Sequence, residues 1–418
     1  MTLAPALAPV RGARSLSTVG IFLIAVLVRL VVAAATVGLG TPADAEPASD
    51  SRIHMQIVRS LLAGSGYALD GEPVASTPPL YVFFLAGLYG LGATPAAVRV
   101  LQALLGAFSC LLLYAAGRRI FDEPTGLVAA GLLAVYPAAS YLAGLHLTEN
   151  LFLPLLLLVV LQAHRTAVRP TLPNALALGG LGGLAALARA VFLAFLPFLF
   201  WWAIATWGVR SRVTYRTAVL AGVGCALVLL PWTVRNAVVL GAFVPVQSNG
   251  AMVFWAGNNP HADGGLVWPT RRTWTGDRPP DDGHYGWRDL SVSQENALYL
   301  REAVRWIREH PQDYLRLVGL KLVRLYGFSR AADGTELRVP LGVAVFQVVL
   351  YGVAVLGAWL AWVRRCRGAI LILLFVFTNL MAILFSGASR YALPMVPSLV
   401  LWAAFGVREA WRRAVEGM

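Results

Sequence analysis

Long apolar runs alternate with short polar connections along most of the 418-residue chain. An α-helix needs about 20 apolar residues to cross the roughly 30 Å hydrocarbon core of a bilayer. The pattern therefore predicts an all-α polytopic membrane protein with about ten transmembrane helices. Their expected positions are 19–39, 97–117, 125–144, 150–166, 174–188, 190–208, 217–239, 340–362, 369–385 and 391–408.

One further apolar stretch, residues 79–91, decides which side of the membrane every later segment faces. If this stretch does not cross, five arginine groups fall on the same side as Arg11 and Arg14, and the positive-inside rule makes that side cytoplasmic. We therefore predict a juxtamembrane helix on the outer face, with both termini cytoplasmic and segments 40–96 and 240–339 outside. The arginine groups lie at 118–119, 165–169, 210–216, 364–367 and 408–413.

The long external segment, residues 240–339, is predicted to cap the outer face and to be partly helical. Ser291 and Gln294 fit a capping box at the start of one helix, and Pro311 suits the first position of a second helix that runs to about Phe328. The first half is rich in Gly, Asn, Pro and Trp and should be irregular. The chain then divides into an N-terminal transmembrane module with its first external loop, a capping loop and the C-terminal transmembrane helices, at 1–239 with 40–96, 240–339 and 340–418.

Composition supports a membrane protein and argues against several other classes. The chain is 58% hydrophobic and 13% charged, whereas about a quarter of the residues of a soluble domain are charged. A net charge of +13 would suggest a nucleic-acid partner in a soluble protein, but these arginines lie at the ends of apolar runs and act as topology signals. The three cysteines and six histidines lack metal-binding spacing. We predict no metal site, no cofactor and no nucleic-acid partner.

Two carboxylates stand out because acids are scarce in this chain and both border the external face. Asp50 follows the first apolar run, and on a helix it shares one face with His54, four residues further on. A carboxylate in this position can be a general base toward a hydroxyl; the alternative is a solvated acid near the lipid headgroups. Glu149 begins the run at 150–166, where an acid is costly and often functional, although acids also favour helix N-termini.

Three arginines, Arg189, Arg235 and Arg390, are exceptions to the charge rule because they lie at the outer ends of apolar runs. A guanidinium matches phosphate oxygens bidentately, so we predict that these arginines bind the phosphate headgroup of a lipid. The alternatives are internal ion pairs with Asp50 or Glu149, or contact with the headgroups of the bilayer.

Aromatic and small residues beside these charges have two readings each. Tyr391 and Trp232 could stack on a sugar or belong to the interfacial aromatic belt, and the belt is the more common arrangement. The glycines between Gly179 and Gly183 favour a close contact between two helices. A phosphate-binding glycine loop is not indicated, because no strand precedes these glycines.

An ordered set of short motifs resembles the GT-C superfamily of glycosyltransferases that use polyprenyl-phosphate sugars. The nearest groups are the family 39 protein mannosyltransferase-like enzymes and the lipid A aminoarabinose transferases. Each motif is weak alone, but the ordered set is quite specific and extends over nearly the whole chain. The motifs are Asp50 in the first external loop, Leu61–Tyr67, Thr77–Tyr81, Gly117–Arg119, Leu147–Phe152, Gly183–Arg189, Pro231–Asn236, Gly257–Pro260 and Arg390–Met395.

The resemblance implies a GT-C-type bundle and an inverting transfer of a sugar from a polyprenyl monophosphate donor to an acceptor hydroxyl at the outer face of the cytoplasmic membrane. Asp50 would be the base, Glu149 would bind a substrate or share that role, and the three arginines would stabilise the phosphate. The acceptor could be a cell-envelope glycan, a lipid or a protein. Further substrate-binding candidates are His54, Tyr81, His146, Asn236, Asn258 and Tyr391.

The sequence departs from the family pattern in two places and leaves other functions open. Ser51 follows Asp50 where many members have a second acid, and His54 stands where many have an aromatic residue, which argues against a carried-over metal site. A lipid-linked sugar transporter or flippase should show inverted repeats or helices broken near mid-bilayer, and neither is indicated. A non-catalytic scaffold is a third reading, because a fold alone does not determine function. The use of arginine in place of lysine favours a GC-rich bacterial source.

Overall fold

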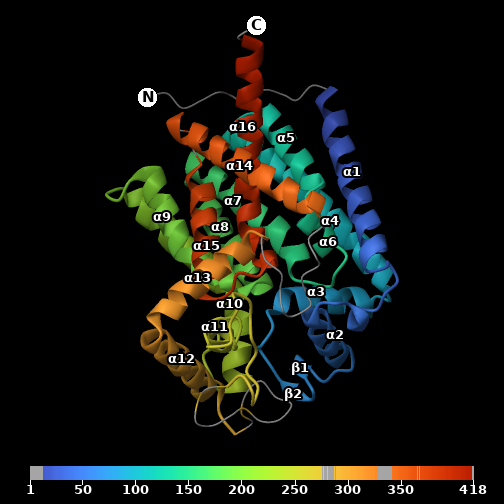
Figure 1. Cartoon of the computed structure of the whole chain (residues 1–418), viewed down its shortest axis with the longest axis vertical. Coiled ribbons are helices and arrows are strands. Elements are labelled where there is room, and N and C mark those ends of the chain that lie inside the picture. The colour runs from blue at the N-terminus through green and yellow to red at the C-terminus, as the bar shows by residue number, and fades with distance from the viewer. Residues whose placement is uncertain are drawn as a thin grey trace.

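The computed structural model describes residues 13–274, 276, 280, 287, 289–327, 341–364, 366 and 368–416. Its helices form a bundle at one end of the molecule, and a smaller group of helices with one β-hairpin lies at the other end (Figure 1). The first turn of α1 (Ala13–Thr36) and the last turn of α16 (Val396–Glu416) lie at the same end, away from this smaller group (Figure 1).

Helices occupy the predicted transmembrane positions. Among the described residues, seven helical segments are long and apolar enough to cross a bilayer, and α5, α8 and α15 are shorter. The prediction of an all-α polytopic membrane protein is confirmed. After α1, the bundle comprises α4 (Pro95–Ile120), α5 (Glu123–Ala134), α6 (Pro137–Leu142), α7 (Glu149–Val168), α8 (Leu172–Ala188), η2 (Ala190–Phe195), α9 (Leu196–Trp207), α10 (Arg212–Leu240), α14 (Leu341–Val363), α15 (Ala369–Leu384), η3 (Ser389–Met395) and α16.

One predicted span is interrupted. The apolar run at 125–144 was expected to form one helix, but α5 ends at Ala134 and α6 begins at Pro137. A residue that precedes proline is disfavoured in the helical conformation, and Tyr136 is accordingly extended, with ψ 115°. Hydropathy is continuous across this break, which is why the apolar pattern did not reveal it.

The short apolar stretch after the first external loop forms α3 (Pro79–Gly90). It lies beside α2 (Ser49–Leu62) at the end of the bundle that faces the smaller group of helices (Figure 1). Val82 and Leu85 of α3 are fully buried, whereas Phe83 is 47% exposed. One face therefore packs on the protein and another is open, as expected of a juxtamembrane helix, and its place on the outer leaflet stays a prediction.

The predicted close contact between helices is confirmed at the glycines of α8. A Cβ atom added at Gly179 would lie 1.8 Å from the carbonyl oxygen of Ala221 in α10. On the opposing helix, a Cβ at Gly224 would lie 2.2 Å from the carbonyl oxygen of Leu176. The two backbones touch without intervening side chains, which is the usual packing of small residues in membrane helix pairs.

The cap, defined here as residues 249–325 where they are described, contains three helices. The capping box is confirmed: the Ser291 amide donates to Gln294 Oε1 (2.9 Å), and the Gln294 amide donates to Ser291 Oγ (3.4 Å). The first half is less irregular than expected because it contains one of the helices, and Phe328, the expected end of the last helix, lies outside the described residues. The helices are α11 (Gly250–Ala256), α12 (Val292–Glu309) and α13 (Pro311–Leu325).

The cap is joined directly to the chain that precedes η3. A Cβ at Gly257 would lie 1.7 Å from the carbonyl oxygen of Phe385, so only glycine allows this approach. The Gly387 amide donates to the carbonyl oxygen of Gly264 at 2.9 Å. Lys321 of α13 is buried and donates to the last turn of α15 at 3.0 Å. These contacts form what we call the cap joint.

A hairpin that sequence reasoning missed completes the first external loop. Asp70 and Gly71 both have positive φ, 52° and 85°, as a two-residue type I′ turn requires. An Asp-Gly pair between two short extended segments is the signal that could have revealed it. The elements of this loop are η1 (Ala43–Ala45), α2, β1 (Ala68–Leu69) and β2 (Glu72–Pro73), with β1 and β2 antiparallel.

Candidate active site

Asp50 lies in the first turn of α2 and faces an arginine from the far end of the chain. No side chain caps this helix, so the Asp50 carboxylate complements the positive end of the helix dipole. Its Oδ2 atom lies 2.8 Å from Nη1 of Arg390, and the two side chains are 37% and 29% exposed. The ion pair therefore lies at an opening of the protein rather than in its core.

A second ion pair lies deeper. Glu149 begins α7, and Arg189 follows the end of α8, so two helix ends present these side chains to each other. Nη1 of Arg189 donates to Oε1 of Glu149 at 2.7 Å, and the side chains are only 11% and 5% exposed. A pair this far from solvent is held in place because losing either partner would leave a charge in a poorly hydrated site.

Tyr391 joins the two ion pairs. The guanidinium carbon of Arg189 and that of Arg390 each lie 5.2 Å from the centre of the Tyr391 ring. Both distances are within the range of cation–π attraction. The structure thus brings together five residues that the sequence singled out, namely Asp50, Glu149, Arg189, Arg390 and Tyr391.

The charges around Asp50 determine its protonation. Desolvation by the surrounding protein raises the pKa of Asp50, but Arg390, with smaller effects from His54 and Arg189, outweighs it and holds the pKa below the ordinary value. Burial lowers the pKa of His54, more than the nearby Asp50 raises it. At neutral pH Asp50 is therefore a carboxylate, and His54 is a neutral imidazole. A deprotonated acid with one exposed edge is what a general base requires.

The alternative of internal ion pairs is realised for two of the three arginines, while Arg235 is placed elsewhere. Arg235 donates to the carbonyl oxygens of Tyr67 (2.9 Å) and Val74 (2.7 Å), and its guanidinium lies over the Trp232 ring at 4.9 Å. It ties the hairpin of the first external loop to α10. The structure thus brings Arg189 and Arg390 to the two carboxylates, whereas the partners of Arg235 include backbone carbonyls and rings.

Three predicted substrate-binding residues have their polar groups occupied within the protein. Tyr81 is fully buried, and its hydroxyl donates to the side chain of Gln102. The Asn236 amide, also fully buried, donates to a backbone carbonyl at 2.9 Å. Asn258, buried as well, accepts a hydrogen bond from Lys321 at 2.8 Å. The polar groups of these residues thus have partners within the protein, and their direct contact with a sugar stays a prediction.

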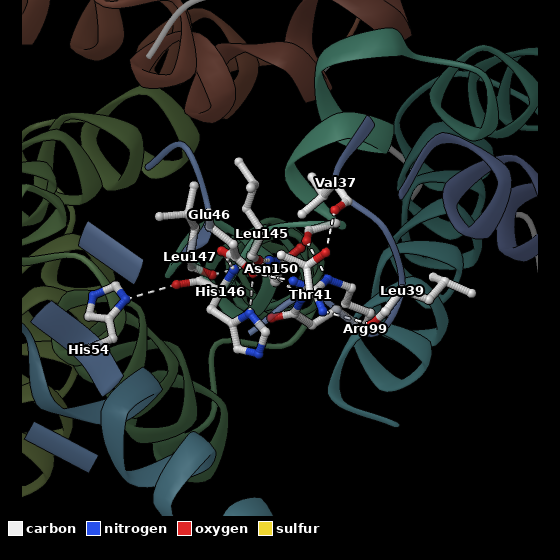
Figure 2. A network of polar contacts seen from close by, with 12 residues as sticks. Val37, Leu39, Thr41, Glu46, His54, Arg99, Leu145, His146, Leu147 and Asn150 are labelled. Atoms are coloured by element: carbon white, nitrogen blue, oxygen red, sulfur yellow. Dashed lines mark hydrogen bonds and ion pairs between the residues drawn. The ribbon is translucent and has the colours of Figure 1, made fainter. Parts of the chain in front are cut away.

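His54 and His146 belong to a buried polar network (Figure 2). Nδ1 of His54 lies 2.9 Å from the carbonyl oxygen of His146, so Nδ1 carries the proton. His146 is fully buried and in turn contacts the carboxylate of Glu46, which also receives a hydrogen bond from Arg99. The two histidines therefore have partners within the protein, and their contact with a substrate stays a prediction. Sequence reasoning missed Glu46 and Arg99, and the only signal was an acid in a chain poor in acids.

No group of three or more His, Cys, Asp and Glu side chains that could hold a metal ion occurs in the described part of the chain. The four charged groups of the site consist of two cations and two anions that pair with each other. Such an arrangement can accept a proton at the exposed carboxylate and can offer guanidinium N–H groups to an anion. It fits acid–base chemistry next to a phosphate.

Comparison with protein families gives one match. Residues 76–234 match the family described as dolichyl-phosphate-mannose-protein mannosyltransferase. The match covers less than half of the chain, so it shows a similarity to that family over this region. This similarity agrees with the predicted resemblance to the GT-C superfamily. No curated protein matches the sequence.

Solved structures of an archaeal oligosaccharyltransferase share the fold of this chain. The archaeal oligosaccharyltransferase AglB from Archaeoglobus fulgidus, in complex with an inhibitory peptide and a dolichol-phosphate, matches with a TM-score of 0.53 and 15% identity over 96% of this chain and 51% of its own. Its apo form matches with a TM-score of 0.53 at 12% identity, over 95% of this chain and 52% of its own. ArnT from Cupriavidus metallidurans bound to undecaprenyl phosphate gives a TM-score of 0.44 and 17% identity, over 94% of this chain and 79% of its own. The chain spans about half the length of the archaeal enzyme.

Proposed function

We propose that this protein is an inverting glycosyltransferase that moves a hexose or pentose from a polyprenyl monophosphate to an acceptor hydroxyl. The observation that carries the proposal is the exposed ion pair of Asp50 and Arg390 together with the more deeply buried pair of Glu149 and Arg189, both of whose arginines lie against the Tyr391 ring. A carboxylate that can act as a base and two guanidinium groups that can bind phosphate thus lie within one small region. The similarity of residues 76–234 to the mannosyltransferase family supports the donor class.

Asp50 acts as the general base. Its exposed carboxylate takes the proton of the acceptor hydroxyl while the hydroxyl oxygen attacks the anomeric carbon of the sugar. The bond between that carbon and the phosphate oxygen breaks, and its electron pair stays with the phosphate, which leaves as polyprenyl phosphate. Attack occurs on the side opposite the leaving group, so the configuration at the anomeric carbon is inverted. No strong general acid is needed, because the phosphate is a stable leaving group.

Arg390 and Arg189 stabilise the negative charge that grows on the phosphate. A guanidinium has five N–H donors, and Arg390 uses one nitrogen for Asp50 and the other terminal nitrogen for the Tyr391 hydroxyl at 3.4 Å. The remaining N–H groups can donate to phosphate oxygens. Because donors and charge are held in place before the reaction, they are most effective where charge develops in the transition state. Glu149 binds a sugar hydroxyl or shares the base role.

We further propose that the reaction takes place at the outer face of a bacterial cytoplasmic membrane, with a cell-envelope glycan, lipid or protein as acceptor. The arginine groups at the inner ends of the helices support this orientation through the positive-inside rule. The common end of α1 and α16, opposite to the cap, agrees with two termini on one side (Figure 1). A donor that enters from the outer leaflet would reach Asp50 without crossing the bundle.

The proposal is tested by sugar transfer with purified protein in detergent. Radiolabelled sugars on a panel of polyprenyl phosphates are offered together with lipid-linked glycan acceptors, to the native protein and to the D50N and D44N variants. Asp44 is a matched control because it is an acid of the same loop whose ion pair with Arg59 is exposed on both sides. We expect transfer by the native protein and D44N, and a loss of at least ~10²-fold in D50N, the scale of a general base. Near-full turnover by D50N would remove Asp50 from the mechanism.

A further inference from the structure

Glu46 is a buried acid that belongs to neither ion pair of the candidate active site. Its side chain is fully buried, and both carboxylate oxygens have donors. Oε1 receives Arg99 Nη2 and the Nδ1 of His146, and Oε2 receives the backbone amide of His146 at 2.8 Å (Figure 2). A buried carboxylate is costly unless such donors compensate it, so the contacts are a built arrangement. Burial raises the pKa of Glu46, but His146 outweighs this and keeps the pKa below its ordinary value.

The same group of residues is tied to Asp50. The carbonyl oxygen of His146 accepts a hydrogen bond from Nδ1 of His54 at 2.9 Å. His54 lies on α2, four residues after Asp50, and therefore on the same face of that helix. A shift of His146 would move its carbonyl oxygen and therefore His54, which donates to it. Asp50 lies one helix turn before His54 and would move as well.

The same group is also tied to Glu149. The segment from Gly144 to Glu149 leads straight into α7, and Nε of Arg99 donates to the carbonyl oxygen of Gly144 at 2.8 Å. Asn150, the next residue, donates from Nδ2 to the carbonyl oxygens of Leu145 (2.9 Å) and Leu147 (3.2 Å), which closes the segment on itself (Figure 2). Glu46 therefore holds a segment whose last residue is one of the two site carboxylates.

We propose that Glu46 is a positioning residue that sets the separation of Asp50 and Glu149. This inference rests on the proposed function and adds a residue that the reacting groups do not touch. Because a displacement of about 1 Å can reduce a reaction rate by ~10²-fold, loss of the Glu46 charge should affect turnover more than donor binding. Donor binding should change less, because Arg390 and Arg189 keep their own carboxylate partners and still contact the phosphate of the donor.

The test separates positioning from folding. E46Q keeps the shape of the side chain but replaces one carboxylate oxygen with an NH2 group, which cannot accept a hydrogen bond, so one of the three donors to Glu46 loses its acceptor. We expect kcat to fall ~10- to 100-fold with a donor KM within ~3-fold of native, while D44N stays at the native rate. In a D50N background E46Q should add less than ~3-fold, because the geometry it disturbs no longer serves a base.

A second pair of variants covers the case in which E46Q does not fold. H54L removes the donor to the His146 carbonyl, and H54N restores an N–H group of similar reach, so kcat should fall in H54L and recover in H54N at equal melting temperatures. Full activity of E46Q and H54L, or an E46Q loss that multiplies with D50N, would overturn the positioning role. A D50N enzyme at native rate would instead overturn the proposed function, so the two failures are distinguishable.

Discussion

Replacing Gly179 with alanine should force α8 and α10 apart. The added Cβ would lie 1.8 Å from the carbonyl oxygen of Ala221, whereas real Cβ atoms essentially never approach within 3.0 Å. The opposing atom belongs to the backbone, so no side-chain rotation can relieve the clash. The two helices would have to separate locally by about 1.2 Å, which also loosens the reciprocal contact of Gly224 with Leu176.

The cost of this separation follows from overpacking of a well-packed interior. Such substitutions destabilise by ~1–3 kcal/mol, and a clash with rigid backbone belongs at the upper end of that range. For a chain larger than 250 residues we expect the melting temperature to fall by at least roughly 3 °C. The measurement is the thermal unfolding of purified G179A protein in detergent, followed by tryptophan fluorescence.

The neighbouring glycine provides the control. A Cβ at Gly180 meets its nearest atom, a side-chain carbon of Val228, at 3.8 Å, which is ordinary contact. G180A should therefore melt within ~1 °C of the native protein, since surface or loosely packed changes are usually nearly neutral. If G179A and G180A melted together, the close contact between α8 and α10 would not exist, and the reasoning would be refuted.

Two further predictions concern charge. Arg390 holds the pKa of Asp50 down against desolvation. R390Q should therefore raise that pKa, shift the acid limb of the pH–kcat/KM profile to higher pH and increase the donor KM. R235Q removes contacts with carbonyls and rings, so it should lower stability but leave the pH profile and the donor KM unchanged. Burial lowers the pKa of Lys321 from 10.5 to about 7, so between pH 7 and 10 the unfolded chain binds more protons and the free energy of unfolding rises with pH. K321M lacks this group, and its melting temperature should rise less than that of the native protein from pH 7 to pH 9; an equal rise in both would contradict the assignment.

Much of the bundle could be predicted because hydropathy and arginine placement act locally. A run of about 20 apolar residues defines a span wherever it lies, and the outer-end positions of Arg189 and Arg390 placed them at the same depth as Glu149 and Asp50. The interruption between α5 and α6 escaped because apolar content continues through it, although Pro137 marks the break. The apolar content of a segment gives no information on the backbone dihedral angles of single residues within it.

The partners of individual polar groups could not be predicted. Arg235 has the same kind of sequence position as Arg390, but it donates to backbone carbonyls, which carry no residue signature. Glu46 meets Arg99 and His146 across 53 and 100 residues of chain. One sequence gives no information on such distances, so a buried network is invisible until the helices are assembled, and the residues nearest to the reaction are identified more easily than those that hold them.

The cap joint limits how the external part of this protein can be exchanged. Because Gly257 and Gly387 meet opposing backbone directly, and Lys321 reaches across from α13, a chimera that receives a foreign cap needs these contacts from the same parent chain. Gly257 and Gly264 of the joint both follow α11, so the start of the stretch between α11 and α12 belongs to this set as well. Recombination boundaries that separate Gly257 or Gly264 from residues 385–387 should therefore yield hybrids that fold poorly.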